Sequence, residues 1–276
     1  MMKLCCLTLS YRRTFEAGAM DLTGFLDECR RLGLDGVDLH EAAFAQEDRA
    51  YLAMVKRACL DRGLAIACVS ISNNFGQAGA ALDADLAKTQ RWIDHAAYLG
   101  APQVRVFAGR TPEGDAEAAA WQRCETSLRR TAAYGADTGV VVSVQNHNHK
   151  MLTRTGADLL RLVQGVAHAN LGHVLDTGQY AGSPGASGST EENRGAFDYL
   201  ASIRQTAPLA THVRCKLYRL ETGREAWLDY DRIFSILRDV RYNGWIALVY
   251  EGVEEDRAAI AKGAPFLREY VARYST

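Results

Sequence analysis

Residues 140–149 read VVVSVQNHNH, and this stretch decides the fold of the chain. A short, mostly β-branched run comes first and polar residues follow it at once. Such a run is typical of a strand that is buried on both faces of a parallel sheet. Parallel α/β folds carry their chemistry at the carboxyl ends of the strands, so Gln145, His147 and His149, which share the parity of one strand face, are candidate site residues. The alternative is a strand that simply runs into a solvated loop.

Similar strand-like runs recur along the chain and alternate with amphipathic stretches of helical length. The predicted helix after Asp21 shows the pattern, with apolar residues at helical spacing, Asp21 as its N-cap and Gly33 as its stop. The predicted strands are residues 4–9, 37–40, 64–71, 104–107, 140–144, 171–175, 212–217 and 246–250. The predicted helices are residues 21–32, 47–61, 82–99, 116–138, 157–166, 193–206, 230–240 and 255–274.

This alternation predicts an α/β fold with parallel strands and right-handed crossovers. Eight strand–helix pairs fit a closed (β/α)8 TIM barrel better than an open sheet, and 276 residues is an ordinary length for one barrel. We therefore expect a single domain over residues 1–276. Residues 181–195, AGSPGASGSTEENRG, are too rich in Gly and Ser to pack a core. They leave the sixth strand at its carboxyl end, so they are either a mobile lid or a merely flexible loop.

The overall composition excludes several classes of protein. The net charge is −1 without a basic block, which indicates neither a nucleic-acid partner nor a membrane surface. No apolar run approaches the roughly 20 residues of a membrane span, and the first residues lack the cleavage site of an export signal. The seven cysteines are odd in number and contain no CxxC, so we expect no disulfide framework and a cytoplasmic location.

Polar residues end most of the predicted strands and should converge if the barrel closes. Asp176 and Glu251 each end an apolar run, so burial requires a cation or a metal beside each carboxylate. Residues His95, His168 and His173 lie in helix or early-strand contexts and are expected to be structural. The converging set is Asp38, His40, Arg105, Gln145, His147, Asp176, His212, Arg214, Lys216 and Glu251.

The predicted seventh strand carries three basic residues with a period of two. His212, Arg214 and Lys216 therefore point to the same side of the strand, and a barrel has no open edge to expose them. Three inward basic groups indicate an anionic or heavily hydroxylated ligand, or internal carboxylate partners.

Five motifs in order resemble the xylose isomerase-like TIM barrel superfamily of sugar and sugar-phosphate isomerases and epimerases, with endonuclease IV as a distant relative. They cover essentially the whole chain: LGLDGVDLHE at 32–41, QNH at 145–147, LDTG at 175–178, HVRCK at 212–216 and YNGWIALVYEG at 242–252. The resemblance implies a barrel with one divalent ion held by Glu, Asp, His and Glu from the last four strands. By motif, those positions are Gln145, Asp176, Arg214 and Glu251 in this chain.

Two of the four positions depart from the family pattern. Gln145 keeps an oxygen ligand but loses the charge, and Arg214 cannot bind a metal because it stays protonated. A divalent ion (Mn, Mg or Zn) held by Asp176, Glu251 and Gln145 is one possibility, with His212 as a further ligand if the register of the seventh strand is shifted. The other is a metal-free centre in which Arg214 lies between Asp176 and Glu251 as the fixed positive charge. No nucleotide cofactor is expected.

The resemblance implies an isomerase or epimerase that removes a proton next to a carbonyl and stabilises an enediolate. Glu251 is then the base, Lys216, Arg214 or a metal supplies the positive charge, and His147 moves a proton or binds a hydroxyl. Arg105, Gln145, Arg214 and His40 are the expected substrate-binding residues. Since only one of the two glutamates of the family's epimerases remains, one-base isomerisation, or elimination by a lyase or dehydratase acting on a keto-sugar or cyclitol, is favoured over two-base epimerisation.

A second class of function is a non-catalytic sugar-binding barrel that has lost its metal. An endonuclease would need a histidine cluster for several zinc ions and a basic surface, and the sequence shows neither. The expected ligand is a small polyhydroxylated or phosphorylated compound, with no nucleic acid or membrane as partner. A homo-oligomer is compatible with the sequence.

Overall fold

Eight parallel strands form a closed barrel in the computed structural model, which describes residues 1–148, 150–185 and 197–274. Each strand pairs with its neighbours in sequence, and β1 closes the ring against β8, where Lys3 is opposite Trp245. The strands are β1 (Lys3–Leu7), β2 (Gly36–His40), β3 (Ala65–Ser70), β4 (Gln103–Phe107), β5 (Val141–Gln145), β6 (Leu171–Asp176), β7 (Ala210–Leu217) and β8 (Trp245–Tyr250). The predicted (β/α)8 barrel is confirmed.

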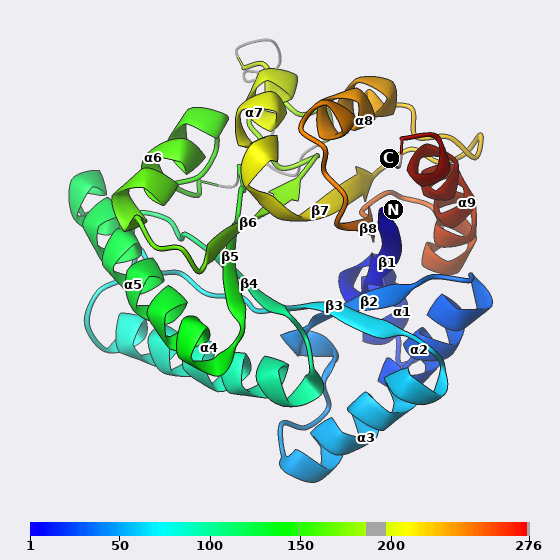
Figure 1. Ribbon diagram of the computed structural model, residues 1–276, viewed down its shortest axis with the longest axis horizontal. Coiled ribbons are helices and arrows are strands. Elements are labelled where there is room, and N and C mark those ends of the chain that lie inside the picture. Colours follow the sequence, from blue (N-terminus) through cyan, green and yellow to red (C-terminus); the bar gives the residue numbers. More distant parts are fainter. Residues whose placement is uncertain (149, 186–196, 275–276) are drawn as a thin grey trace.

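The helices lie outside the ring of strands, and α9 packs beside β8 and β1, close to the N-terminus (Figure 1). The α-helices are α1 (Arg12–Glu16), α2 (Leu22–Arg31), α3 (Arg49–Asp61), α4 (Gly79–Leu99), α5 (Glu117–Thr138), α6 (Gly156–Val166), α7 (Tyr199–Thr206), α8 (Tyr230–Asp239) and α9 (Asp256–Tyr274). Short 3-10 helices in the described part of the chain lie between strands and α-helices: η1 (Thr8–Tyr11), η2 (Glu41–Ala43) and η4 (Ala207–Leu209).

Local signals fix where the helices begin and end. The Asp21 side chain accepts a hydrogen bond from the Gly24 N–H, which caps α2 as the sequence predicts. Thr155 and Asp158 form a reciprocal capping box at the start of α6. Gly100 and Gly139 end α4 and α5 in the left-handed conformation, which costs glycine little.

One glycine is required by a close approach between strands. A Cβ atom on Gly36 would lie 2.4 Å from the Ala65 carbonyl oxygen and 2.9 Å from the Trp245 ring. Gly36 begins β2, so this contact explains why the LGLDG motif ends in glycine: a side chain would push β2 away from β3.

The first strand is shorter than predicted, because side-chain hydrogen bonds replace strand pairing after Leu7. Thr8 Oγ1 accepts from the His40 N–H at 3.0 Å. Ser10 Oγ donates to the Leu248 carbonyl and accepts from the Tyr250 N–H, both at 3.1 Å. These bonds hold η1 and the start of α1 across the carboxyl ends of β2 and β8, and this turn and short helix were not predicted.

The region after β6 differs from the prediction in where its helix begins. The helix predicted over 193–206 begins later, at Tyr199, because Asp198 caps it through a bond from the Ala201 N–H. The predicted lid, residues 181–195, falls mostly on residues 186–196, which lie outside the described part of the chain. His149 also lies outside it.

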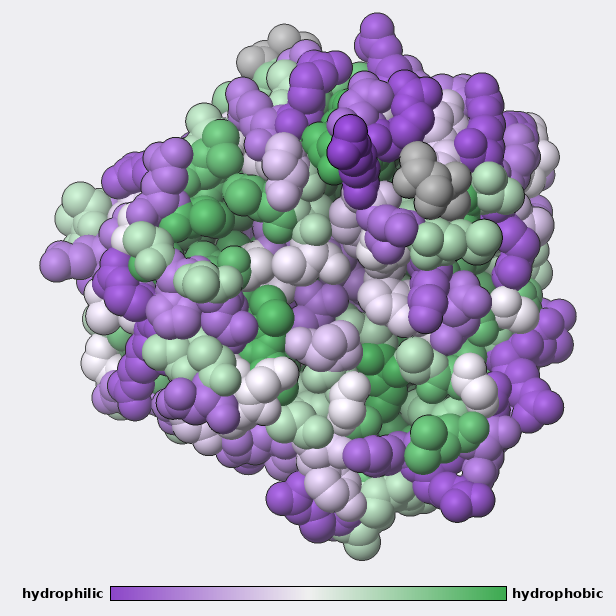
Figure 2. Space-filling model, viewed as in Figure 1, coloured by the Kyte–Doolittle hydropathy of each residue, from purple (hydrophilic) through white to green (hydrophobic). Residues whose placement is uncertain are grey.

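The main apolar core lies between the strands and the helices, with Trp92, Phe25 and Phe234 among its largest buried side chains. Figure 2 shows hydrophilic residues around the periphery of one face, over the outer helices, as expected for helices that bury only their inner side. None of the described helices combines the length and the apolar character that a bilayer span requires. All seven cysteines are buried and free.

Candidate active site

Charged side chains occupy the inside of the barrel toward the carboxyl ends of the strands, which is where the sequence predicts the site. Six of these residues are at most 6% exposed, a strong departure from the usual exclusion of charge from interiors. They are Asp38, His40, Arg105, Asp176, Arg214 and Lys216. Each must therefore be neutralised or hydrogen-bonded by its neighbours.

Arg214 pairs with Asp38, on the other side of the barrel. Its Nε and Nη2 atoms donate to the same Asp38 oxygen at 3.0 and 2.8 Å, and Nη2 also donates to Ser70 Oγ. Burial alone would raise the pKa of Asp38, but Arg214, and then His212, hold it well below its usual value. Burial alone would likewise lower the pKa of Arg214, and Asp38 raises it instead. The two charges are fixed as an ion pair.

Gln145 connects this pair to the carboxylate of β6. Its Oε1 accepts from Arg214 Nη1 at 2.8 Å, and its Nε2 donates to Asp176 Oδ2 at 3.0 Å. Asn146 reinforces the same contact, since its side chain binds both the N–H and the carbonyl of Asp176. Both ends of the Gln145 amide are engaged, and the sequence did not single out Asn146.

Lys216 lies between the two carboxylates that end β6 and β8. Its Nζ is 2.7 Å from Glu251 Oε1 and 3.4 Å from Asp176 Oδ2. The prediction that each carboxylate has a cationic partner is thus confirmed, but the placement of Arg214 between Asp176 and Glu251 is wrong. Lys216 is one pleat further along β7 and nearer the mouth of the barrel, and it is Lys216 that lies between the Asp176 and Glu251 carboxylates.

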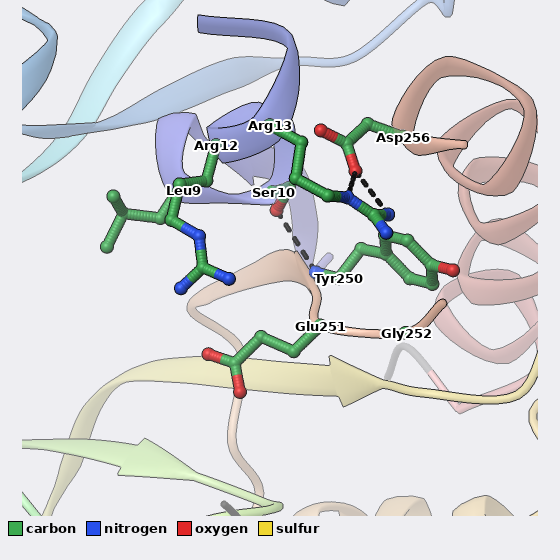
Figure 3. Close-up of a pocket in the computed structure, with 8 residues that line it drawn as sticks. All are labelled: Leu9, Ser10, Arg12, Arg13, Tyr250, Glu251, Gly252 and Asp256. Carbon is green, nitrogen blue, oxygen red and sulfur yellow. Dashed lines mark hydrogen bonds and ion pairs between the residues drawn. The ribbon is translucent and has the colours of Figure 1, made fainter. Parts of the chain in front are cut away.

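The carboxylates at the two sides of Lys216 differ in their exposure. Asp176 is fully buried, and burial raises the pKa of its carboxyl despite the nearby Lys216. The Glu251 side chain is 35% exposed and lines a pocket at the mouth of the barrel, between η1 and the residues that follow β8 (Figure 3). Of the two, Glu251 is the carboxylate that a dissolved ligand can reach.

The described residues do not fit a divalent ion at the positions that the family resemblance implies. Lys216 Nζ occupies the space between Asp176 and Glu251, and the Gln145 oxygen is turned toward Arg214. Over the described ranges, no group of three or more His, Cys, Asp or Glu side chains is arranged to hold a metal. A metal bound by Gln145, Asp176 and Glu251 would require Lys216 to move away.

His212 does not take the place of a ligand to such an ion. Its ring is fully buried, and its Nε2 lies 3.2 Å from the Asp38 carboxylate that also binds Arg214. It lies one pleat before Arg214 on β7, on the side away from the mouth, and so belongs to the Asp38 ion pair rather than to Asp176 and Glu251.

Arg105 and His40 lie on the β2–β4 side of the site. Arg105 is 1% exposed, donates from Nη1 to the Ile71 carbonyl at 2.7 Å and lies over the Phe107 ring at 4.2 Å. Burial, followed by repulsion from Arg214, lowers the pKa of Arg105 to about 9. The rings of His147 and Phe107 are nearly perpendicular, with centres 5.2 Å apart, so His147 lies at the mouth beside the end of β4.

His40 has both ring nitrogens in local hydrogen bonds. Its Nδ1 accepts from the Ala42 N–H at 3.2 Å and its Nε2 lies 3.3 Å from Ser72 Oγ. Burial, and then the positive charge of Arg105, lowers the pKa of His40 to about 3, so the ring is neutral. His173, expected to be structural, is buried between the Val144 carbonyl and the Tyr180 hydroxyl.

Comparisons with known proteins show what this chain is similar to. The family model described as "Xylose isomerase-like TIM barrel" matches residues 26–270. A Mus musculus protein named "Putative hydroxypyruvate isomerase" is 25% identical over 187 residues, which are 64% of this chain and 62% of that protein. The chain thus spans less than two thirds of the length of this relative.

Solved structures of sugar epimerases share the fold. The structure of an L-ribulose 3-epimerase has a TM-score of 0.78 and 17% identity, covering 99% of this chain and 96% of that one. D-allulose 3-epimerase from Methylomonas sp. has a TM-score of 0.76 and 16% identity, covering 98% of both chains. A Bacillus anthracis protein described as a probable 3-DHS dehydratase has a TM-score of 0.73 and 18% identity, covering 97% and 99%. At these identities the likeness shows the fold alone.

Proposed function

Since the chain belongs to the xylose isomerase-like TIM barrel family, we propose that it is an isomerase or epimerase of a small keto-sugar or sugar phosphate, in which Lys216 takes the place of a divalent ion. The observation that carries the proposal is the contact of Lys216 Nζ with Glu251 and Asp176 at the mouth of the barrel. A base and a fixed positive charge at hydrogen-bond distance are the two groups that enediolate chemistry requires.

The roles follow from exposure and charge. Glu251 takes the proton from the carbon next to the substrate carbonyl, because it is the carboxylate of the pair that a solute can reach. The Lys216 ammonium donates to the carbonyl oxygen and stabilises the negative charge that develops there as the enediolate forms. Glu251 then returns the proton to the former carbonyl carbon, while the proton of the neighbouring hydroxyl moves to the oxygen held by Lys216. The carbonyl shifts by one carbon, and no net charge is gained or lost.

Asp176 acts through Lys216 as a positioning residue. Being fully buried, it cannot reach a substrate directly, and its contact with Lys216 holds the ammonium at the end of β7. Gln145 in turn holds Asp176 in place, because its amide is hydrogen-bonded both to Asp176 and to Arg214, which is paired with Asp38. A continuous chain of hydrogen bonds and ion pairs from β2 to β8 thus fixes Lys216 before the substrate arrives, as electrostatic stabilisation requires.

The presence of one accessible carboxylate favours a one-base reaction. Gln145 stands where the family resemblance implies a second glutamate, and its amide can neither take nor give a proton at ordinary pH. Isomerisation through one base is therefore the preferred reaction. Elimination of water by the same base and cation is the alternative, and the product distinguishes them.

The test is proton exchange at the carbon next to the carbonyl. The protein is incubated in D2O with a panel of ketoses and ketose phosphates, and loss of the C–H signal and formation of product are followed by NMR. We expect exchange with at least one compound, and Glu251→Gln should lower its rate by about 10²–10⁴-fold, the usual contribution of a general base. Glu254→Gln is the matched control, since Glu254 lies on the same loop as Glu251 and is also paired with a lysine, Lys262 of α9.

Exchange in the Glu251→Gln variant at the wild-type rate would overturn the role of this residue. Binding of a sugar without exchange, while the protein remains folded, would favour the non-catalytic sugar-binding barrel instead.

A further inference from the structure

The pocket that contains Glu251 is too small for a whole sugar. Its volume is about 100 Å³, below the roughly 300–1,000 Å³ of ordinary small-molecule sites. It lies between η1 with the first residues of α1 and the segment that follows β8 (Figure 3). A pocket of this size beside the base has room for one functional group of a substrate whose remainder lies over the mouth of the barrel.

Most polar groups that line the pocket are already engaged within the protein. Arg13 donates from Nε and Nη2 to Asp256 Oδ1 at 2.8 and 2.6 Å, and Asp256 also accepts from the Thr14 N–H. Ser10 is held between the Leu248 carbonyl and the Tyr250 N–H. These contacts make a rigid wall whose charges cancel, since Arg13 and Asp256 form an ion pair.

Arg12 is different. Its ion pair is with Glu16, at 3.8 Å, and both side chains are 67% exposed, so the pair contributes little. In Figure 3 the Arg12 and Glu251 side chains extend toward the same side of the pocket, whereas Arg13 turns the other way toward Asp256. The Arg12 guanidinium is thus a loosely held cation beside the base.

The charges of the site suggest that the Arg12 guanidinium is the cation that binds an anionic group of the substrate. Lys216 is shared by Asp176 and Glu251, and the proposed reaction uses its third N–H at the carbonyl oxygen, so a second anionic group of the substrate needs another cation. The planar guanidinium of arginine binds phosphate and carboxylate groups through two parallel hydrogen bonds. We propose that Arg12 binds the terminal phosphate or carboxylate of the substrate in the pocket beside Glu251.

This inference rests on the proposed function and narrows its substrate class to keto-sugars with an anionic end. Three compounds with the same keto frame test it: D-fructose, D-fructose 6-phosphate and D-fructuronate. Their dissociation constants are measured by calorimetry with the wild type, with Arg12→Gln, and with Arg57→Gln as control. Arg57 makes the same kind of exposed pair four residues along a helix, with Asp61, but it lies on the outer helix α3.

We expect the wild type to bind at least one anionic compound about tenfold or more tightly than D-fructose, as one hydrogen bond to a charged group allows. If D-fructose 6-phosphate binds more tightly, the anionic group of the substrate is a phosphate. If D-fructuronate binds more tightly, that group is a carboxylate. Arg12→Gln should remove the preference without changing the melting temperature, and Arg57→Gln should keep it.

Two results would overturn the inference: no preference for either anionic compound in the wild type, or a preference that survives in Arg12→Gln. Because these are binding measurements, they are separate from the D2O exchange. Exchange of a neutral ketose, with no effect of Arg12→Gln on binding, would support the proposed function and reject this inference. Binding that depends on Arg12, without any exchange, would support this inference and reject the proposed enediolate chemistry.

Discussion

Arg214 and Asp38, which are 176 residues apart in the sequence, form an ion pair across the barrel, with two hydrogen bonds of 3.0 and 2.8 Å to one carboxylate oxygen. Both side chains are nearly inaccessible. Removing one partner of such a buried pair leaves an uncompensated charge, which costs much more than the pair itself contributes.

Arg214→Ala should therefore lower the free energy of unfolding by about 3–5 kcal/mol. Arg57→Ala, which breaks an exposed pair with Asp61, should lower it by no more than about 1 kcal/mol. Chemical denaturation of the two variants checks the difference. Equal, small losses would mean that the Asp38 carboxylate does not depend on Arg214.

The sequence predicts the barrel well because each element carries its own local signal. The β-branched run at 140–144, the Asp21 cap and the glycine stops all act within a few residues, and the strands and helices follow them. The unpredicted turn after β1 depends instead on Ser10 bonding to Leu248 and Tyr250, which are distant in sequence. Local patterns cannot report contacts of this kind.

The site was predicted as a set of residues but not as a set of pairs. Parity places His212, Arg214 and Lys216 on one face of β7, but it does not give their depth in the barrel. Two residues along a strand amount to about 6.6 Å, enough to exchange one carboxylate partner for another. Asp38 became the partner of Arg214, and Lys216 that of Asp176 and Glu251, only once the ring of strands was closed.

Lys216→Met should change how stability depends on pH. Without the ammonium, Asp176 and Glu251 repel each other, so the already raised pKa of Asp176 should rise further and the carboxyl should take up a proton. A carboxyl with a raised pKa in the folded state loses stability as pH rises through that pKa. The variant should thus be less stable at pH 8 than at pH 5, relative to wild type. Lys262→Met, which unpairs Glu254 but brings no second carboxylate against it, should not show this change. If the free energy of unfolding of Lys216→Met and of wild type varied with pH in the same way, the pairing of Lys216 with Asp176 and Glu251 would be contradicted.

His40 and His173 should stay neutral in the folded protein at all ordinary pH values. Burial lowers the pKa of His173 to about 4 and, together with Arg105, that of His40 to about 3. In the unfolded chain both should titrate near pH 6.5, so the unfolded state binds more protons and stability falls as pH drops below about 6.5. NMR titration of the ring nitrogens between pH 5 and 8 should show no midpoint for either residue. A midpoint near 6.5 in the folded protein would contradict their burial.

The seven thiols should be unreactive in the native state. All are buried, and burial raises the pKa of Cys5, Cys68, Cys124 and Cys215, so little thiolate is present. Ellman's reagent should modify fewer than one cysteine per chain within minutes without denaturant, and all seven in guanidinium chloride. Rapid reaction of a native thiol would show that part of the barrel opens readily.

Mn²⁺ binding to the purified, EDTA-treated protein tests most directly whether the Lys216 ammonium holds the position of a divalent ion. Calorimetric titration with MnCl2 should show no stoichiometric site in the wild type. Lys216→Ala should gain one, because the Asp176 and Glu251 carboxylates then face a vacated space with oxygen ligands. One tightly bound Mn²⁺ per wild-type chain, lost in Asp176→Asn, would contradict the claim.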